Sequence, residues 1–215
     1  TFSGGEPLVR GDIFDVIKRA NDNGLYCTIA SNGILMTSEV VEKLYNSGIR
    51  RVEIGLDGVK AETHDFLRNK KGSFKATVEG IKNCVNHGNF DEIAITTTLY
   101  QPNAEEIPKI IDFAESLGGT RFYLNRLIPA GRGKDITHLD VSCDEKKSIL
   151  LDLHRRFCAS VSNGGCIQCY ARGMTYLSRV GYEESQGKLF TVSEAFSGYE
   201  NMFQKKFGVE LPKFV

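Results

Sequence analysis

Along the first two thirds of the chain, short apolar segments alternate with amphipathic segments. The apolar segments predict strands at residues 25–33, 50–58, 92–101 and 121–129. Apolar positions at helical spacing predict helices at residues 12–21, 37–48, 75–88 and 105–119. Thr37 or Ser38 would cap the second helix, and Gly48 would end it. Strands that alternate with helices in this way are typical of right-handed βαβ units around a parallel sheet. We therefore predict an α/β fold, with five strands if the first few residues form one.

The alternation ends near Gly133, and the rest of the chain has a different pattern. Residues 143–161 read as one helix, whereas residues 163–215 are irregular and rich in glycine and aromatic residues. These aromatic side chains supply apolar surface that a disordered linker lacks. We therefore predict that residues 1–140 form the α/β core and that residues 141–215 form a helix plus a small irregular C-terminal extension.

Composition and charge exclude several kinds of partner. The 215 residues contain 27 Lys and Arg and 27 Asp and Glu, so the formal net charge is zero. A neutral chain has no overall field that would recruit nucleic acid or an anionic membrane. No apolar run approaches the roughly 20 residues of a membrane span, and no charged-then-apolar leader opens the chain. We expect a cytoplasmic protein that binds neither nucleic acid nor membrane.

The six cysteines do not suggest a disulfide framework, because they are scattered through a chain large enough to fold without cross-links. Cys27 lies in a predicted strand and Cys84 in a predicted helix, so both are interpreted as buried apolar residues. Cys166 and Cys169 form a CxxC pair, which can be half of a zinc or iron–sulfur site. Because no spacing identifies further ligands, two buried or loop thiols are the alternative.

Polar and glycine residues follow almost every predicted strand, where parallel α/β sheets place their ligand sites. In the first turn, Gly4 and Gly5 let a ligand approach the backbone closely, and Glu6 adds a negative charge. Pro7 would stiffen the first turn of the following helix. This corner suits a ligand that carries an ammonium group rather than a phosphate. The alternative is a tight turn in which Glu6 only favours the helix dipole.

Four motifs in series mark these strand ends. They are SGGEP at residues 3–7, SNG at 31–33, IGLDG at 54–58 followed by HDFLRNKKGSF, and LNRLIPAGRG at 124–133. With these motifs in this order, the chain resembles the radical SAM superfamily over residues 1 to about 135. It is similar to the branch with SPASM- or twitch-type C-terminal extensions, which includes peptide-modifying and haem-biosynthesis enzymes. The resemblance implies a six-stranded partial (β/α)6 TIM-type barrel that binds S-adenosylmethionine (SAM) and a 4Fe-4S cluster across the strand ends.

The resemblance also implies that the cluster ligands lie upstream of residue 1. Members of the family hold the cluster with a CxxxCxxC loop that follows the first strand and precedes the SGGEP turn. Because this chain starts at that turn, we expect a barrel that lacks its first βα unit. Such a fragment would by itself be unable to reduce SAM.

Several positions take a cofactor-binding role from the resemblance. The turn from Gly4 to Pro7 matches the one that meets the methionyl amino group of SAM, and Ser31 and Asn32 match a polar strand end near the cofactor. Arg68 matches an arginine that meets the SAM carboxylate, with a solvated arginine at a helix end as the alternative. Asp57 would order its turn beside the cofactor. Related enzymes often have serine at the position of Gly55, so a hydroxyl contact there would be lost or supplied by another residue.

The last predicted strand would contribute further contacts. Leu127 and Ile128 would offer backbone and apolar surface to the adenine. Asn125 would face the cofactor only if Arg126 points away, because side chains alternate along a strand. Arg132 would hold a carboxylate or phosphate of the substrate, or would instead brace the turn by bonding to backbone carbonyls.

The implied activity is reductive cleavage of SAM to a 5′-deoxyadenosyl radical, which takes a hydrogen atom from a peptide or tetrapyrrole-type substrate. The implied partners are that substrate and an electron donor such as ferredoxin or flavodoxin. An auxiliary iron–sulfur cluster would involve Cys166 and Cys169. The four histidines have no partner in this chemistry and are interpreted as structural or surface residues.

Two other functions stay open on the sequence. One is a metal-dependent α/β barrel enzyme in which Glu6 and Asp57 act as metal ligands or as acid–base carboxylates. The other is a non-catalytic module that binds a peptide or protein along an open sheet edge.

Overall fold

The computed structural model of the chain describes residues 1–128, 131–142, 144–146, 148–149 and 152–153, without the side chains of residues 131–133. The chain divides into two compact units, Thr1–Asp140 and Val141–Val215. All strands of the described residues belong to the first unit. No helix in the described part of the chain has the length and apolar character needed to cross a membrane.

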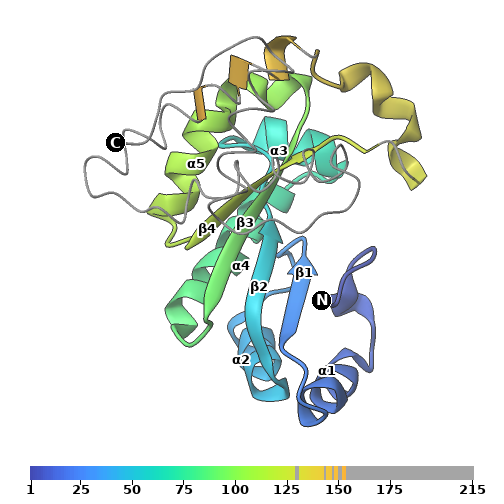
Figure 1. Ribbon diagram of the computed structural model, residues 1–215, viewed down its shortest axis with the longest axis vertical. Coiled ribbons are helices and arrows are strands. Elements are labelled where there is room, and N and C mark those ends of the chain that lie inside the picture. Colours follow the sequence, from blue (N-terminus) through green and yellow to red (C-terminus); the bar gives the residue numbers. More distant parts are fainter. Residues whose placement is uncertain (129–130, 143, 147, 150–151, 154–215) are drawn as a thin grey trace, which may run out of the picture. The chain divides into compact units, whose positions relative to one another are not determined.

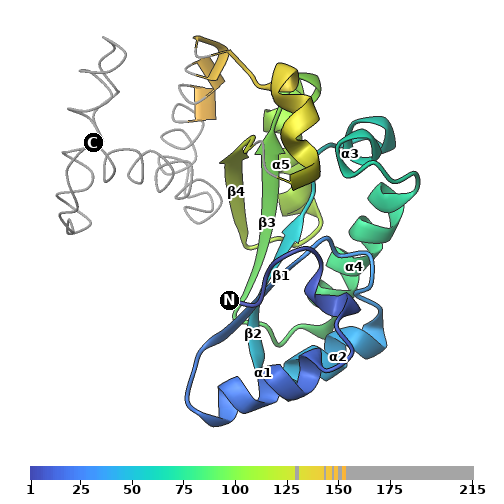
Figure 2. The ribbon, with the colours of Figure 1, turned by 90° about the vertical axis from the view of Figure 1, so that its right-hand side faces the viewer.

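A parallel sheet of four strands forms the centre of the first unit (Figure 1). In chain order, its strands are β1 (Cys27–Ser31), β2 (Ile49–Gly55), β3 (Glu92–Leu99) and β4 (Arg121–Arg126). The helices are α1 (Ile13–Asp22), α2 (Ser38–Ser47), α3 (Ala61–Arg68), α4 (Ser73–His87) and α5 (Ile107–Ser116). Right-handed crossovers between sequential parallel strands place their helices on one face of the sheet. Figure 2 shows α1, α2 and α4 along that face.

The two faces of the sheet differ in polarity because side chains alternate along each strand. Val52 and Ile54 of β2 are fully buried on the face that packs against the helices, whereas Arg51 and Glu53 on the other face are partly exposed. The helices contribute side chains that are also fully buried, namely Ile17, Val41, Leu44, Ile81 and Ile110. Cys27 and Cys84 are buried as predicted. The apolar face therefore builds the core, whereas the polar face is partly exposed.

Helix ends agree with the prediction where the sequence signal is strong. Thr37 caps α2 by accepting a hydrogen bond from the backbone N–H of Val40 (3.3 Å), and Gly48 ends the helix in the left-handed conformation with φ of 113°. The sequence did not predict α3, which has eight residues and follows Lys60, a residue that makes no side-chain capping bond. It likewise did not predict the 3-10 helix η2 (Gln101–Glu106).

The first and last predicted strands need correction. At the N-terminal end of the described chain only Phe2 pairs with the sheet, in a parallel bridge to Ile29. The chain leaves the extended conformation at once, because Gly4 adopts φ of 133°. The last strand ends at Arg126 rather than at residue 129. Residues 144–146, 148–149 and 152–153, which lie inside the helix predicted at 143–161, are helical.

Candidate functional site

A cavity of about 650 Å³ lies on the polar face of the sheet, at the carboxyl ends of β1, β2 and β3. Alternate strand positions supply part of its wall, namely Ala30, Glu53, Gly55, Thr96 and Thr98. The last residues of β1 and α3 and the turns supply the rest, namely Ser3, Gly4, Gly5, Glu6, Ser31, Asn32, Ile34, Arg68, Asn69 and Lys70. Carboxylates and basic side chains thus share one wall, and the volume is in the range of small-molecule sites.

Glu6 joins the first turn to the end of β1. Its Oε1 accepts hydrogen bonds from the hydroxyl of Ser31 (2.8 Å) and from the backbone N–H of Leu8 (3.1 Å). Its Oε2 accepts one from the backbone N–H of Asn32 (2.8 Å). A carboxylate offers about four acceptor positions, so Glu6 retains capacity for one further donor. All three protein donors are neutral, so the negative charge of Glu6 is not balanced by them.

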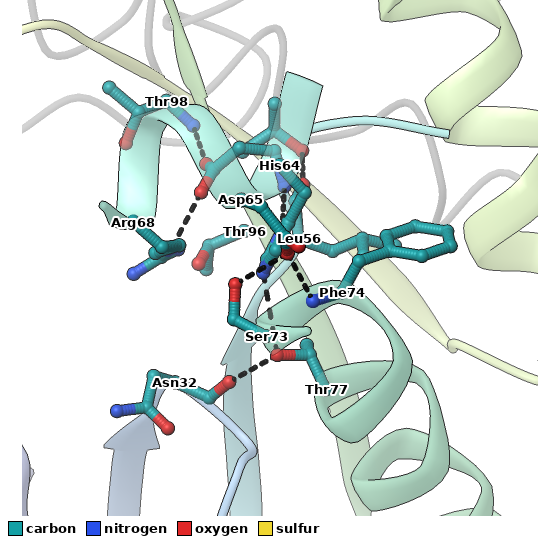
Figure 3. A network of polar contacts seen from close by, with 12 residues as sticks. Asn32, Leu56, His64, Asp65, Arg68, Ser73, Phe74, Thr77, Thr96 and Thr98 are labelled. Atoms are coloured by element: carbon teal, nitrogen blue, oxygen red, sulfur yellow. Dashed lines mark hydrogen bonds and ion pairs between the residues drawn. The ribbon is translucent and has the colours of Figure 1, made fainter. Parts of the chain in front are cut away.

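Asp57 and Arg68 form a second corner of the cavity just after the end of β2. Figure 3 labels Arg68, His64 and Thr98 in the network of polar contacts around it. The carboxylate of Asp57 has no exposed surface; its Oδ1 accepts from the backbone N–H of Thr98 (2.8 Å), and its Oδ2 accepts from Nε of Arg68 (2.7 Å). The side chain of Arg68 is 30% exposed and reaches the cavity. Its Nη1 and Nη2 donate to no acceptor among the described residues.

His64 connects the two corners through a chain of hydrogen bonds. The backbone N–H of Asp57 donates to Nδ1 of His64 (3.1 Å), so the ring proton of the neutral histidine lies on Nε2. Nε2 lies 3.5 Å from Oγ1 of Thr77, and that hydroxyl donates to the carbonyl of Asn32 (2.8 Å). Burial lowers the pKa of His64, which is fully buried, so the neutral form is favoured.

Charged side chains also pair across the polar face further from the strand ends. Arg51 forms an ion pair with Glu92 (2.8 Å) and another with Glu53, and Arg121 pairs with the same Glu92 (2.9 Å). The hydroxyl of Tyr123 also contacts Arg51. These side chains bond to one another. The side chain of Glu53 is therefore held in place where a ligand at the strand ends would contact it.

Comparison with known proteins identifies the family. The sequence model of the radical SAM superfamily matches residues 1–114, more than half of the chain. The chain belongs to the radical SAM superfamily. AdoMet-dependent heme synthase of Methanosarcina barkeri is 41% identical over 133 residues, 62% of this chain and 38% of that protein. Mycofactocin maturase MftC of Mycolicibacterium smegmatis is 35% identical over 133 residues, 62% of this chain and 33% of that protein.

The chain therefore spans well under half the length of these radical SAM relatives. A solved structure of native anSMEcpe with bound AdoMet and Kp18Cys peptide resembles it with a TM-score of 0.65 at 16% identity. The match covers 83% of this chain and 51% of that chain. At this level of identity the likeness shows the fold alone.

The structure brings together six of the predicted cofactor-binding residues around the cavity, namely Gly4, Gly5, Glu6, Ser31, Asn32 and Arg68. Two others lie behind this wall. Pro7 is buried at the start of the 3-10 helix η1 (Pro7–Val9), and Asp57 holds Arg68. The role of Asp57 beside a cofactor stays a prediction.

The predicted residues after β3 are placed differently. Among the described residues, β4 and the segment that follows it contribute none to the cavity wall. Asn125 is exposed, Leu127 is 9% exposed, and Ile128 is 63% exposed. The side chain of Arg132 and both Cys166 and Cys169 lie outside the described residues.

Sequence reasoning missed several polar and charged wall residues, among them Glu53, Thr96 and Lys70. The alternation along strands is the signal that points to two of them. Glu53 precedes Gly55 by two positions, and Thr96 precedes Thr98 by two, so each lies on the same face as its partner. Lys70 follows the end of α3, a helix that the sequence did not predict.

The described residues fit SAM but not an iron–sulfur cluster. For SAM, the wall offers acceptor capacity at Glu6 and donors at Arg68. For the cluster, no group of three or more His, Cys, Asp or Glu within the described chain is arranged to hold a metal. Burial raises the pKa of Cys84 to about 12, so a thiolate is disfavoured there. No role in cluster binding is therefore assigned to the described residues.

Proposed function

We propose that residues 1–140 are the SAM-binding part of a radical SAM enzyme and that residues 141–215 are a SPASM/twitch-like or substrate-covering extension. The fold proposed for the first part is a partial (β/α)6 barrel. Sequential parallel order and a polar face opposite the helices support this arrangement, because both are features of a sheet that curls around its ligand site.

In this proposal SAM occupies the cavity at the strand ends. The SAM amino group donates to Glu6, whose charge favours a cation. The SAM carboxylate accepts from the planar fork of Arg68. Gly4 and Gly5 let the backbone approach the ligand, since neither position has another heavy atom within 4 Å of where a side chain would start. Ser31 and Asn32 hold the carboxylate of Glu6 in place.

With SAM held by Glu6 and Arg68 beside a reduced 4Fe-4S cluster, the cluster would supply one electron for cleavage of the SAM carbon–sulfur bond to methionine and a 5′-deoxyadenosyl radical, the species that would take a hydrogen atom from the substrate. The residues of this chain would bind and orient SAM. We assign the electron to a donor such as ferredoxin or flavodoxin. We assign the substrate to peptides or tetrapyrroles, because relatives of the chain are named as a heme synthase and a mycofactocin maturase.

The observation that carries this proposal is that one cavity holds both a carboxylate that has no cationic partner among the described residues, Glu6, and the two terminal nitrogens of Arg68, which have no acceptor there. A metal-dependent enzyme is less well supported, because Asp57 is buried and already paired with Arg68. A non-catalytic module receives no support from a cavity lined by four charged side chains, Glu6, Glu53, Arg68 and Lys70.

The test is anaerobic reconstitution of the full-length protein with iron and sulfide, followed by assay of SAM binding and of 5′-deoxyadenosine after reduction. Binding together with 5′-deoxyadenosine formation supports the proposal. A protein that binds SAM without cleaving it is a SAM-binding module, and one that binds no SAM contradicts the proposal.

A further inference from the structure

The backbone conformation of residue 55 does not require glycine. Gly55 is the last residue of β2, and its backbone is outside the left-handed region that favours glycine. Any residue could adopt its backbone angles. The reason for glycine must therefore lie in the space beside it.

That space is filled by the guanidinium of Arg68. A Cβ atom on residue 55 would overlap Nη2 of Arg68 and would lie 3.0 Å from its Cζ and 3.3 Å from its Nη1. The end of a free arginine side chain would move aside at little cost. Arg68 is not free, because its Nε is bonded to Asp57 at 2.7 Å.

If the guanidinium of Arg68 were displaced, the carboxylate of Asp57 could not move with it. This carboxylate is fully buried and its other oxygen accepts from Thr98 on β3. The backbone carbonyl of Asp57 accepts from Nδ2 of Asn103 (2.9 Å), and its backbone N–H donates to His64. A buried carboxylate that loses its cation is costly, so displacement of Arg68 is opposed.

The helix that carries Arg68 is equally fixed. His64 and Arg68 are four residues apart on α3, so they lie on the same side of the helix, and both bind Asp57. The carbonyl of Thr63 accepts from the hydroxyl of the buried Tyr100 (2.6 Å), and the hydroxyl of Thr63 donates to Glu106 (2.9 Å). The guanidinium is thus held from both ends of its side chain.

We propose that Gly55 and Asp57 are positioning residues for Arg68. Because Gly55 has no side chain, the guanidinium of Arg68 can occupy the space beside it at the cavity wall. Asp57 holds this guanidinium through Nε alone. The two terminal nitrogens therefore form a preset pair of donors for the carboxylate of the ligand, and little ordering is left to be done on binding. This inference rests on the proposed function, since it assumes that the ligand is SAM.

The experiment measures binding by the full-length, reconstituted protein of two probes, SAM and decarboxylated SAM. The second probe lacks only the group that the preset donors would take. We expect the wild-type protein to bind SAM roughly 10- to 100-fold more tightly than decarboxylated SAM, as for one charge-assisted pair. Equal affinity for the two probes overturns the inference without any variant.

Gly55→Ala tests the positioning. We expect it to weaken SAM binding roughly tenfold or more and to leave the affinity for decarboxylated SAM unchanged, a pattern that general misfolding cannot give. In an Arg68→Ala background the same change should alter SAM affinity by less than about twofold. Asp57→Asn, which retains an acceptor for Thr98 but loses the acceptor for Nε, should reproduce the selective loss.

Gly11→Ala is the matched control. Gly11 is exposed, and apart from its chain neighbours no described heavy atom lies within 4 Å of the position that a Cβ atom would take. The Gly11→Ala variant should therefore bind both probes like the wild type. Normal SAM binding by Gly55→Ala, or an equal loss for both probes, overturns the inference alone. Failure of the wild-type protein to bind SAM overturns the proposed function and this inference with it.

Discussion

Two carboxylates stand at the same edge of the sheet, one beside β1 and one after β2, and the protein treats them differently. Glu6 is half-buried in the cavity wall and accepts three hydrogen bonds from neutral donors. Asp57 is fully buried and bonded to a guanidinium. The ends of neighbouring parallel strands therefore carry the same chemical group in two electrostatic states.

The comparison shows which charge remains for a ligand. The charge of Asp57 is balanced inside the protein by Arg68. No Lys, Arg or His of the described chain lies within ion-pair distance of Glu6. The protein therefore keeps the Glu6 charge at the surface of the cavity, where a cationic ligand group would balance it. Glu6 and Asp57 carry the same chemical group. They differ in burial, and this difference makes Glu6 the carboxylate that can bind a ligand and Asp57 the one that supports Arg68.

The largest expected effect is on stability at the Asp57 corner. Asp57→Ala removes the partner of Arg68 and leaves the backbone N–H of Thr98 without its acceptor. We expect the free energy of unfolding, measured by urea denaturation, to fall by about 3 kcal/mol. Glu6→Ala should cost about 1 kcal/mol, because the donors it leaves can reach water in the cavity. Equal losses for the two variants would contradict the difference in burial on which the comparison depends.

The next effect is on ligand affinity at the Glu6 corner. Glu6→Gln keeps the size of the side chain but removes its charge and places an amide against the N–H of Asn32. We expect the dissociation constant for SAM, measured by isothermal titration on the reconstituted protein, to rise about tenfold. Glu39→Gln on the exposed side of α2 is the control and should leave it unchanged. If Glu6→Gln does not alter the dissociation constant for SAM, the cationic group of the ligand does not bind at this corner.

The contrast between the two corners was only partly predictable from the sequence. Glycines, a carboxylate and a proline in one turn identified the Glu6 side of the first corner, because these residues are adjacent in the sequence. The positions of Ser31, Asn32 and Arg68 followed from the family motifs. The alternation of apolar and polar segments likewise predicted the parallel sheet and most of its helices.

The Asp57 corner could not be derived in the same way. Its partners come from β3, α3 and η2, and nothing in the local sequence indicates which of them reaches a given oxygen. The role of Gly55 depends on an arginine 13 positions later in the chain, and α3 itself lacks a capping signal. Adenine contacts predicted from Leu127 and Ile128 stay a prediction, since the described cavity wall ends at β3.

His64, which supports the Asp57 corner, should make stability depend on pH. Burial lowers the pKa of His64 below its ordinary value near 6.5, with nearby Arg68 lowering it further and Asp57 and Asp65 opposing. Below about pH 6.5 the unfolded chain binds a proton at this residue and the folded chain does not, so acid favours unfolding. Stability should fall from pH 7 to pH 5.5 with a slope of at most about 1.4 kcal/mol per pH unit.

His64→Asn isolates this contribution, because the asparagine oxygen can accept from the N–H of Asp57 but does not titrate in this range. Contributions from residues that the two proteins share cancel in the difference between the two urea-denaturation series. The variant should show a shallower fall of stability between pH 7 and pH 5.5. Parallel pH profiles would mean that His64 is not held neutral in the folded protein.

The smallest expected effect is on the link between the two corners. Thr77→Val removes the hydroxyl that donates to the carbonyl of Asn32, and should lower the free energy of unfolding by about 1 kcal/mol. Thr97→Val is a matched control, because Thr97 is equally buried and donates to the carbonyl of Leu56 (2.6 Å). Both variants should therefore lose similar stability.

A double-mutant cycle with Glu6→Gln separates these two threonines. Glu6 and Thr77 bind the N–H and the carbonyl of the same residue, Asn32, so their losses should be non-additive by about 0.5 kcal/mol or more. The losses of Glu6→Gln and Thr97→Val should add within about 0.4 kcal/mol. If the Thr77 cycle is also additive, the corners are independent, and the binding carboxylate is held by its own turn without support from the network around His64.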